Sequence, residues 1–289
     1  MMAPASYASL DLGGMRVTTI NAGRFALDGG AMYGVVPRPL WARVTPPDDR
    51  HRIPMACNCL VVETPHECIL IDAGLGQRFD ARAREIFDVD TDSSLQNGLS
   101  RAGIDPEQIT HVLFTHLHFD HSAGALTTVA DKVRPTFVNA QHLAQDGEID
   151  DGLACRSIMG SSYVPSDISL LRTATRLEGI SGDTEIFPGV HVEVTGGHTE
   201  HHQAVWLRGR EQTLVYPADL LPTRHHLRPY WIMAYDMFPH ETLTVKHDFI
   251  RRILEQDCIV AWDHDPLSPF SHLRKTPDGV EAIDIGTMP

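Results

Sequence analysis

The sequence predicts a single α/β (α+β) domain. Two observations support this prediction: apolar, β-branched segments that are typical of buried strands recur along the chain, and amphipathic segments typical of helices lie between them. A third is that no repeat, low-complexity tract or long linker divides the 289 residues. A chain of this length buries about three quarters of the surface of its unfolded state. We therefore expect one domain over residues 1–289.

Strands dominate the first third of the chain. We expect them at Met15–Ala22, Cys59–Glu63 and Cys68–Asp72, the last of which runs into a glycine turn at Gly74. Cys57 lies two residues before Cys59, so the two thiols face the same way in a strand. We expect both to be buried core thiols rather than zinc ligands, because their spacing is not that of a zinc ribbon.

Two helices and one ambiguous segment follow from local patterns. Ser93–Ala102 is expected to be a helix that ends at Gly103, and Glu241–Gln256 has the apolar stripe of an amphipathic helix. The segment 141–181 is rich in Gly, Ser and Asp and has weak periodicity. It is expected to be a long loop or an insertion over a site.

Four further strands each end in side chains that can bind metal. They are 109–115 before His116-Leu117-His118-Phe119-Asp120-His121, 191–195 before His198, 213–216 before Asp219, and 258–262 before Asp263-His264. If these strands lie in neighbouring sheets, their ends share one rim. His116 and His118, two residues apart in an extended chain, project to one side, whereas Asp120 and His121 approach from the turn.

The histidines on these strand ends predict a metal site. The chain has 17 histidines, and a neutral imidazole is a common metal ligand. A lone histidine after a strand is usually a surface or capping group, and Asp219 alone could cap the next segment. Together, however, the strand ends supply five imidazoles and two carboxylates, which are too many for one tetrahedral zinc. The set suits two metals bridged by a carboxylate and a water.

Charge and hydropathy exclude other classes of partner. The net charge is −14, which argues against nucleic-acid binding because such proteins carry a basic stripe. No run approaches the ~18 apolar residues of a membrane span, so we expect no membrane partner. The N-terminus has neither a basic start nor an apolar stretch typical of a secretory signal. The expected location is the cytoplasm.

The segment Thr115–Gly124 resembles the signature of the metallo-β-lactamase superfamily, and Asp72, His198, Asp219 and His264 follow in that family's order. The resemblance spans about residues 15–272, which we take as the core of the domain. It implies a four-layer αββα sandwich with the site at one edge. It implies one metal on His116, His118 and His198, a second on Asp120, His121 and His264, Asp219 as the bridge, and Asp72 as a support rather than a ligand.

Within this family the chain resembles the lactonase-like branch, which includes acyl-homoserine-lactone lactonases and enzymes of the methyl-parathion-hydrolase type. The residues that carry this likeness are Phe25–Gly34 and Ala218–Thr223. One departure is Pro222, which stands where such lactonases carry a tyrosine. Tyr33 and Tyr235 are the two candidates for supplying the missing hydroxyl. A second departure is Glu200-His201, which replaces the usual Pro-Gly after the motif threonine and leaves the ligand His198 intact.

The ligand set and the resemblance together predict a dinuclear hydrolase. A bridging hydroxide would attack the carbonyl of a lactone or ester, with an acyl-homoserine lactone or similar lactone as substrate, zinc as the expected metal and Asp120 as a proton shuttle. This activity is that of a quorum-quenching lactonase, and the branch makes a homodimer possible. The expected apolar substrate pocket consists of Met32, Tyr33, Phe119, His226, Tyr235 and Met237.

Three alternatives stay open on the sequence. The same hydroxide could serve a phosphotriester or aryl-ester hydrolase. A mononuclear iron dioxygenase and a metal-binding protein without activity are the other two, and the full set of seven ligands favours hydrolysis over both. Metal analysis discriminates between them, since two zinc-like ions per chain favour hydrolysis and one iron favours oxidation.

Overall fold

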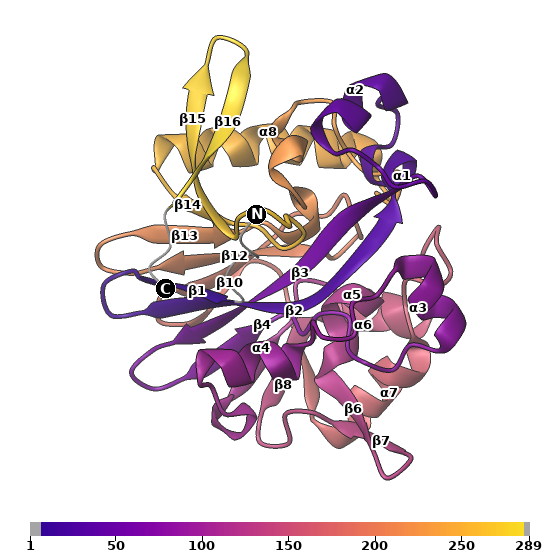
Figure 1. Ribbon diagram of the computed structural model, residues 1–289. Helices are drawn as coiled ribbons and strands as arrows, with labels where there is room; N and C mark the ends of the chain where they lie inside the picture. Colours follow the sequence, from indigo (N-terminus) through magenta and orange to yellow (C-terminus); the bar gives the residue numbers. More distant parts are fainter. Residues whose placement is uncertain (1–6, 286–289) are drawn as a thin grey trace.

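Two seven-stranded sheets lie face to face in the computed structural model, which describes residues 7–285 (Figure 1). The first sheet has the order β1 (Tyr7–Asp11), β2 (Arg16–Asp28), β3 (Arg52–Glu63), β4 (Cys68–Ile71), β5 (His111–Leu113), β8 (Gln141–Gln145) and β9 (Leu177–Ile180). The second has the order β10 (Thr184–Phe187), β11 (Val190–Val194), β12 (Gln203–Arg208), β13 (Thr213–Tyr216), β14 (Ile259–Ala261), β15 (Phe270–Thr276) and β16 (Gly279–Asp284). A separate hairpin pairs β6 (Leu126–Val129) with β7 (Lys132–Pro135).

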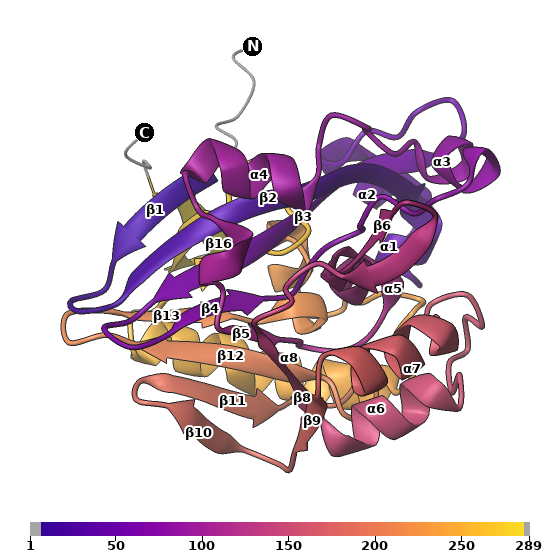
Figure 2. The same cartoon turned by 90° about the horizontal axis from the view of Figure 1, so that it is seen from below.

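Helices cover the outer faces of both sheets, which confirms the predicted αββα sandwich (Figures 1 and 2). The helices are α1 (Gly29–Tyr33), α2 (Arg38–Val44), α3 (Ala81–Phe87), α4 (Leu95–Ala102), α5 (Phe119–Ser122), α6 (Asp146–Leu153), α7 (Pro165–Ala174) and α8 (Pro239–Glu255). α4 packs on the first sheet and α8 on the second. Within residues 7–285, none of these helices has the length and apolar character that crossing a bilayer requires.

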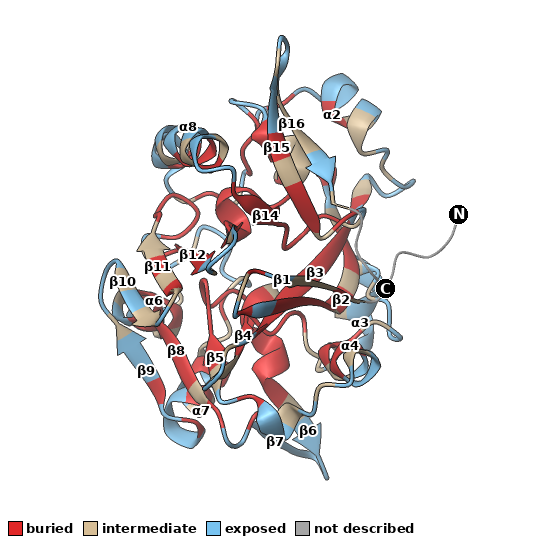
Figure 3. Ribbon diagram, turned by 90° about the vertical axis from the view of Figure 1, so that its left-hand side faces the viewer, coloured by how far each residue is buried: buried red, intermediate tan, exposed pale blue. Residues whose placement is uncertain are grey.

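Hydrophobic side chains fill the space between the two sheets, because successive side chains along each strand point to opposite faces of its sheet. In β3, Leu60 and Val62 point to the second sheet, whereas Cys59 and Val61 point to the helices on the outer face. Figure 3 shows the resulting buried strands at the centre of the molecule. Cys57 and Cys59 are both buried, as predicted from their spacing.

The segment 141–181 is not a long loop. It contains β8, α6, α7 and β9, and the two helices connect a pair of parallel strands. Its helical pattern is hard to detect because the buried residues of α6 include Glu148, Asp151 and Gly152 beside the apolar Ile149. A helix that buries carboxylates does not show the apolar periodicity on which the prediction depends.

The metal-competent strand ends do share one rim. β13 and β14 run parallel, and β11 is antiparallel to β12, which is antiparallel to β13. The carboxyl ends of β11, β13 and β14 therefore meet at the same edge of the second sheet. β5 brings its own end to that edge from the first sheet.

One buried histidine makes the fold sensitive to acid. The Nδ1 of His226 lies 2.8 Å from Thr223 Oγ1, and its Nε2 donates to the Met32 carbonyl at 2.9 Å. Burial lowers the pKa of His226 to about 3. An unfolded histidine has a pKa of about 6.5, so the unfolded chain binds this proton first and stability falls as the pH drops below about 6.5.

We therefore expect His226→Gln to reduce the acid sensitivity of the metal-free protein. Between pH 7 and pH 5, His226 should account for about 2 kcal/mol of lost unfolding free energy. Urea unfolding at both pH values, followed by circular dichroism, measures this difference in both proteins. An equal loss in the variant and the parent would show that His226 is not held neutral by the fold.

Candidate metal centre

Asp219 stands at the centre of the side chains that the strand ends bring together. Its Oδ2 lies 2.9 Å from His198 Nε2, 3.6 Å from His116 Nε2 and 3.7 Å from His121 Nε2. Its Oδ1 lies 3.2 Å from His264 Nε2. All five residues are buried. One carboxylate therefore faces four imidazoles that come from both sheets.

The cluster divides into two groups that share Asp219. The first is His116, His118, His198 and Asp219, and the second is His121, Asp219, Asp263 and His264. Within each group the candidate ligand atoms lie within 4.8 Å of one another. Ligand atoms about 2.0–2.2 Å from a zinc ion would be roughly 3.3–3.6 Å apart. The spacing fits two adjacent divalent cations.

Asp120, a predicted ligand, falls outside both groups, whereas Asp263 belongs to the second. Asp120 is half-buried at the rim, with Oδ2 3.6 Å from His264 Nε2 and Oδ1 4.0 Å from His121 Nε2. Asp263 is buried beneath it and was not among the predicted ligands. The sequence feature that could have identified Asp263 as a candidate ligand is its position directly before His264 at the end of a strand.

Local backbone geometry places the ligands. After β5 the chain turns into the short helix α5, so His118 is its N-terminal cap and Asp120 and His121 lie in the helical turn. Gly197, directly before His198, has a φ of 81°, and a Cβ there would lie 2.6 Å from Thr242 Oγ1. Only glycine fits this approach to α8 without strain.

A layer of acceptors and hydroxyls orients the imidazoles. His121 Nδ1 lies 2.9 Å from Asp72 Oδ2, and His198 Nδ1 lies 3.0 Å from Asp236 Oδ1. His264 Nδ1 donates to the Ala56 carbonyl at 2.7 Å. These bonds turn each Nε2 to the cluster, where the neutral imidazole presents a lone pair, as is usual for metal-binding histidines. Asp72 thus lies behind a ligand, where the family resemblance places a support.

The charges of the cluster call for positive compensation. Burial lowers the pKa of His116 and His118 well below the usual range. Burial also acts on His198, but Asp219 outweighs it and raises the pKa of His198 to about 10. Burial raises the pKa of Asp263 to about 8, against the opposing effect of the neighbouring His264. The carboxylates therefore draw protons onto imidazoles unless another cation is present.

Several buried acceptors have no hydrogen-bond partner within the described part of the chain. At this cluster they are His116 Nε2, His118 Nε2, Asp219 Oδ1 and both carboxylate oxygens of Asp263, with His202 Nε2 beside His116 and His198. Unpaired buried nitrogen and oxygen acceptors are rare in proteins and need a specific explanation. Imidazole nitrogens and carboxylates that converge in this way form a donor set for divalent cations. The residues present thus fit two such ions.

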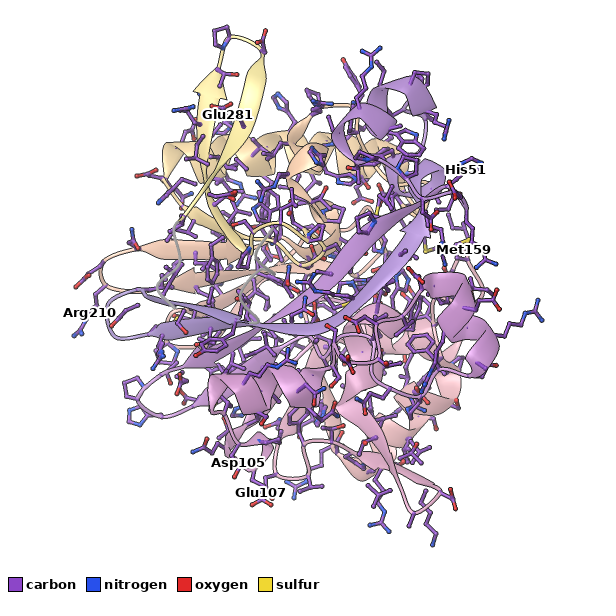
Figure 4. All side chains as sticks on the ribbon, viewed as in Figure 1. His51, Asp105, Glu107, Met159, Arg210 and Glu281 are labelled. Atoms are coloured by element: carbon purple, nitrogen blue, oxygen red, sulfur yellow. The ribbon has the colours of Figure 1, made fainter. Side chains whose placement is uncertain are left out.

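A small cavity of about 70 Å³ opens beside the cluster. Outside the ligands its wall is mostly apolar and includes two serines. It is formed by Leu27, Met32, Phe87, Phe119, Met159, Ser161, Ser162, Met233 and Tyr235. A second cavity of about 310 Å³ adjoins it and shares Phe87 and Phe119. Figure 4 shows Met159 at the outer edge of the molecule beside α3. The cluster therefore opens onto a mostly apolar wall, and the adjoining cavity is lined by apolar residues together with the charged Arg78, Asp80 and Asp167.

Three of the six predicted pocket residues line this cavity, namely Met32, Phe119 and Tyr235. Tyr33, His226 and Met237 are not among its lining residues. The Tyr33 hydroxyl lies 2.6 Å from Thr45 Oγ1, and its ring stacks on His226 with centroids 5.2 Å apart. The Met237 backbone donates to the His198 carbonyl at 3.1 Å. These three residues pack behind the pocket wall because α1 and the 224–227 turn hold two of them inside the core.

A third cluster, Asp151, Glu200 and His201, lies outside this centre. Its one buried carboxylate, Asp151, already pairs with Arg156 at 2.9 Å. Asp151 thus already has a cationic partner within the chain.

Comparison with known proteins agrees with this geometry. The model of the metallo-beta-lactamase superfamily matches residues 52–264. An N-acyl homoserine lactonase of Bacillus sp. is 26% identical over 157 residues, which are 51% of this chain and 56% of that protein. The chain thus matches little more than half the length of this curated relative.

Two solved structures share the fold. A probable metal-dependent hydrolase from Staphylococcus aureus superposes with a TM-score of 0.86 at 27% identity, covering 97% of this chain and 100% of the other. AidC, a dizinc quorum-quenching lactonase in complex with a product, superposes with a TM-score of 0.81 at 19% identity, covering 98% and 99%. The family match extends over well over half of the chain, from β3 to the last predicted ligand, and the chain therefore belongs to the metallo-beta-lactamase superfamily.

Proposed function

We propose that this protein is a dinuclear metal hydrolase that acts on the carbonyl of a lactone or ester, with an acyl-homoserine lactone or a similar lactone as substrate. The observation that carries the proposal is that Asp219 belongs to both ligand groups, so that two cations would share one carboxylate. The curated relative named as an N-acyl homoserine lactonase supports the substrate class. The dizinc centre of AidC, which has the same fold, supports the metal.

When bound, the two cations supply Lewis acidity and lower the pKa of water toward neutrality. The chain's own residues hold the cations, move a proton and exclude bulk water. Asp120 lines the cavity beside the ligands. Its carboxylate can take the proton from the attacking water and return it to the leaving oxygen once the acyl carbon–oxygen bond breaks. The apolar wall keeps the local dielectric low, which strengthens every charge interaction in the site.

Tyr235 is the better candidate for the hydroxyl that Pro222 does not supply. It lines the cavity, and burial raises its pKa, so that its hydroxyl remains a proton donor. The Tyr33 hydroxyl is engaged with Thr45 behind the wall. A donor at Tyr235 can hydrogen-bond the carbonyl oxygen or the leaving oxygen of a substrate in the cavity.

Glu148 positions the first group of ligands. Its buried carboxylate accepts from the Leu117 backbone at 3.0 Å, the Tyr163 hydroxyl at 2.7 Å and Thr199 Oγ1 at 2.7 Å. Leu117 lies between His116 and His118, and Thr199 follows His198. One carboxylate thus ties together the two loops that carry three imidazoles.

The central prediction concerns metal and activity together. We expect the parent protein to hold two zinc-like ions per chain and to hydrolyse acyl-homoserine lactones with a higher kcat/KM than aryl esters or phosphotriesters. His118→Ala and Asp219→Ala should each lose bound metal and at least about a hundredfold in kcat/KM, which corresponds to roughly 2.7 kcal/mol of transition-state stabilisation. Elemental analysis and a substrate panel provide the measurements.

The control for these variants is His201→Ala, a histidine on the same loop as His198 but outside both ligand groups, which should retain metal and activity. Full activity in a metal-depleted His118 or Asp219 variant would refute the proposal. A single bound iron would favour an oxidative enzyme, and a preference for phosphotriesters would favour the alternative hydrolase.

Tyr235→Phe should lower kcat/KM for lactones about tenfold, because one hydrogen bond in the transition state is worth about 1.4 kcal/mol. Metal content should not change. The matched control is Tyr33→Phe, which removes a hydroxyl that faces away from the cavity and should leave kcat/KM intact. The reverse order of the two variants would assign the donor role to Tyr33.

Glu148→Gln should weaken binding of one of the two ions by about tenfold, because the amide can accept fewer of the three donors and the ligand loops lose their common anchor. Chelator competition with zinc measures the affinity. Glu200→Gln, an exposed neighbour of Thr199, is the control and should bind both ions normally. Unchanged zinc affinities in Glu148→Gln would show that Glu148 stabilises the fold and does not position the ligands.

A further inference from the structure

Asp263 is fixed in place by the backbone around it. The Asn58 backbone donates to the Asp263 carbonyl at 2.7 Å, and the Asn58 side-chain amide donates to the Trp262 and Asp265 carbonyls at 3.0 and 2.9 Å. The Asp263 side chain is 1% exposed, and its Oδ2 lies 3.5 Å from His264 Nε2. The carboxylate is therefore held against the second ligand group.

Two other buried acids nearby, Asp72 and Asp265, are satisfied, whereas Asp263 is not. Asp72 accepts from the Thr115 backbone and hydroxyl, each at 2.8 Å. Asp265 accepts from Arg224 Nε at 2.7 Å and from the Leu267 backbone at 2.9 Å. Neither oxygen of Asp263 has a hydrogen-bond partner among residues 7–285. Burying a carboxylate without a partner costs free energy. The site therefore implies a partner for Asp263 that hydrogen bonding within the chain does not supply.

The neighbouring atoms show what that partner is. His264 Nε2 and His121 Nε2 lie 3.2 Å apart, and both Nδ1 atoms are committed to partners behind them, the Ala56 carbonyl and Asp72. Two imidazole lone pairs and the carboxylates of Asp219 and Asp263 thus converge. Within the described residues, neither a lysine nor an arginine pairs with Asp263. Such a set of acceptors is satisfied together by one cation.

We propose that Asp263 supplies an additional carboxylate ligand to the second cation, beside His121, Asp219 and His264, with Asp120 at the rim. The inference rests on the proposed dinuclear function and adds a ligand to the seven that the sequence predicted. Three carboxylates and two imidazoles form a harder and larger ligand set than a tetrahedral zinc site requires. This position therefore favours hard divalent ions of higher coordination number, such as Mn²⁺, more than the first position does.

The test is metal binding by the full chain. Metal-free protein is titrated with Zn²⁺ and with Mn²⁺ against a chelating dye, and the bound metal is counted by elemental analysis. We expect two ions per chain in the parent protein. Asp263→Asn should weaken Mn²⁺ binding at the weaker-binding position at least tenfold and change Zn²⁺ binding less than threefold. Asp265→Asn, which removes a buried carboxylate aimed away from the cluster, should leave both affinities unchanged.

A structural role would give a different thermal result. Without metal, Asp263→Asn should unfold at the same or a higher temperature than the parent, because it replaces an unpartnered buried carboxyl group with an amide that is never charged. Its stabilisation by Mn²⁺ should be smaller. Asp265→Asn should unfold at a lower temperature, because it removes the buried carboxylate that pairs with Arg224 Nε at 2.7 Å and leaves that arginine, among the described residues, only its partner Asp284. A metal-free Asp263→Asn that is less stable than the parent and equally stabilised by Mn²⁺ would overturn the proposal.

Co²⁺ bound to the parent protein provides a measurement that does not depend on a variant. A second Co²⁺ with five or six ligands absorbs weakly in the visible range, whereas four-coordinate Co²⁺ absorbs strongly. Intense absorption from both ions, or Asp263→Asn with the parent's Mn²⁺ and Zn²⁺ affinities, would overturn the extra ligand and leave the dinuclear function standing. A parent protein that binds one ion or none would refute the dinuclear function and this inference together.

Discussion

The structure depends on the burial of carboxylates and imidazole lone pairs at one edge of two packed sheets. Asp219 faces four imidazoles from both sheets, and Asp263 lies beneath them without a hydrogen-bond partner among the described residues. Such a collection of acceptors is unfavourable unless positive charge is present. Protons on imidazoles can supply that charge, but then the same nitrogens lose their lone pairs. Two divalent cations satisfy the carboxylates and the lone pairs at once.

The fold meets this constraint by fixing the acceptors before any cation arrives. Asp72 at the end of β4, Asp236 before α8 and the Ala56 carbonyl in β3 each orient one imidazole. Glu148 in α6 ties together the loops of the first ligand group. These supports come from both sheets and from the connecting segments. Because the ligands are already oriented, less conformational entropy opposes metal binding, and the site keeps a defined geometry.

The same edge is compatible with the proposed class of substrate. A neutral ester or lactone needs a polar reacting centre beside an apolar surface, and the ligand cluster opens onto a wall of aromatic and methionine side chains. The wall continues into the adjoining cavity past Phe87 and Phe119. A substrate with an apolar tail can therefore lie along this surface while its carbonyl faces the cluster.

The residue order alone determined the strands that carry the cluster and most of its candidate ligands. Apolar, β-branched runs and the spacing of His116, His118, Asp120 and His121 are local features, so they can be read without knowing which segments meet. The four strand ends could also be assigned to one rim, because parallel strands bring their carboxyl ends to the same edge. The observed bounds of α4 and β13 agree to within two residues with the bounds predicted from the helix end at Gly103 and from the apolar run of the strand.

Only the tertiary structure decided the features that depend on burial by distant segments. α6 escaped detection because its buried face carries Glu148 and Asp151, and the partners of Glu148, among them Leu117 and Thr199, lie far away in the chain. Tyr33 and Tyr235 are equivalent by residue type, and the packing of α1 against Thr45 directs one hydroxyl away from the cavity while the other tyrosine lines it. Asp263 became a candidate ligand only when three chain segments enclosed it. Local pattern sets what each segment can form, whereas long-range packing decides which polar groups are left to act together.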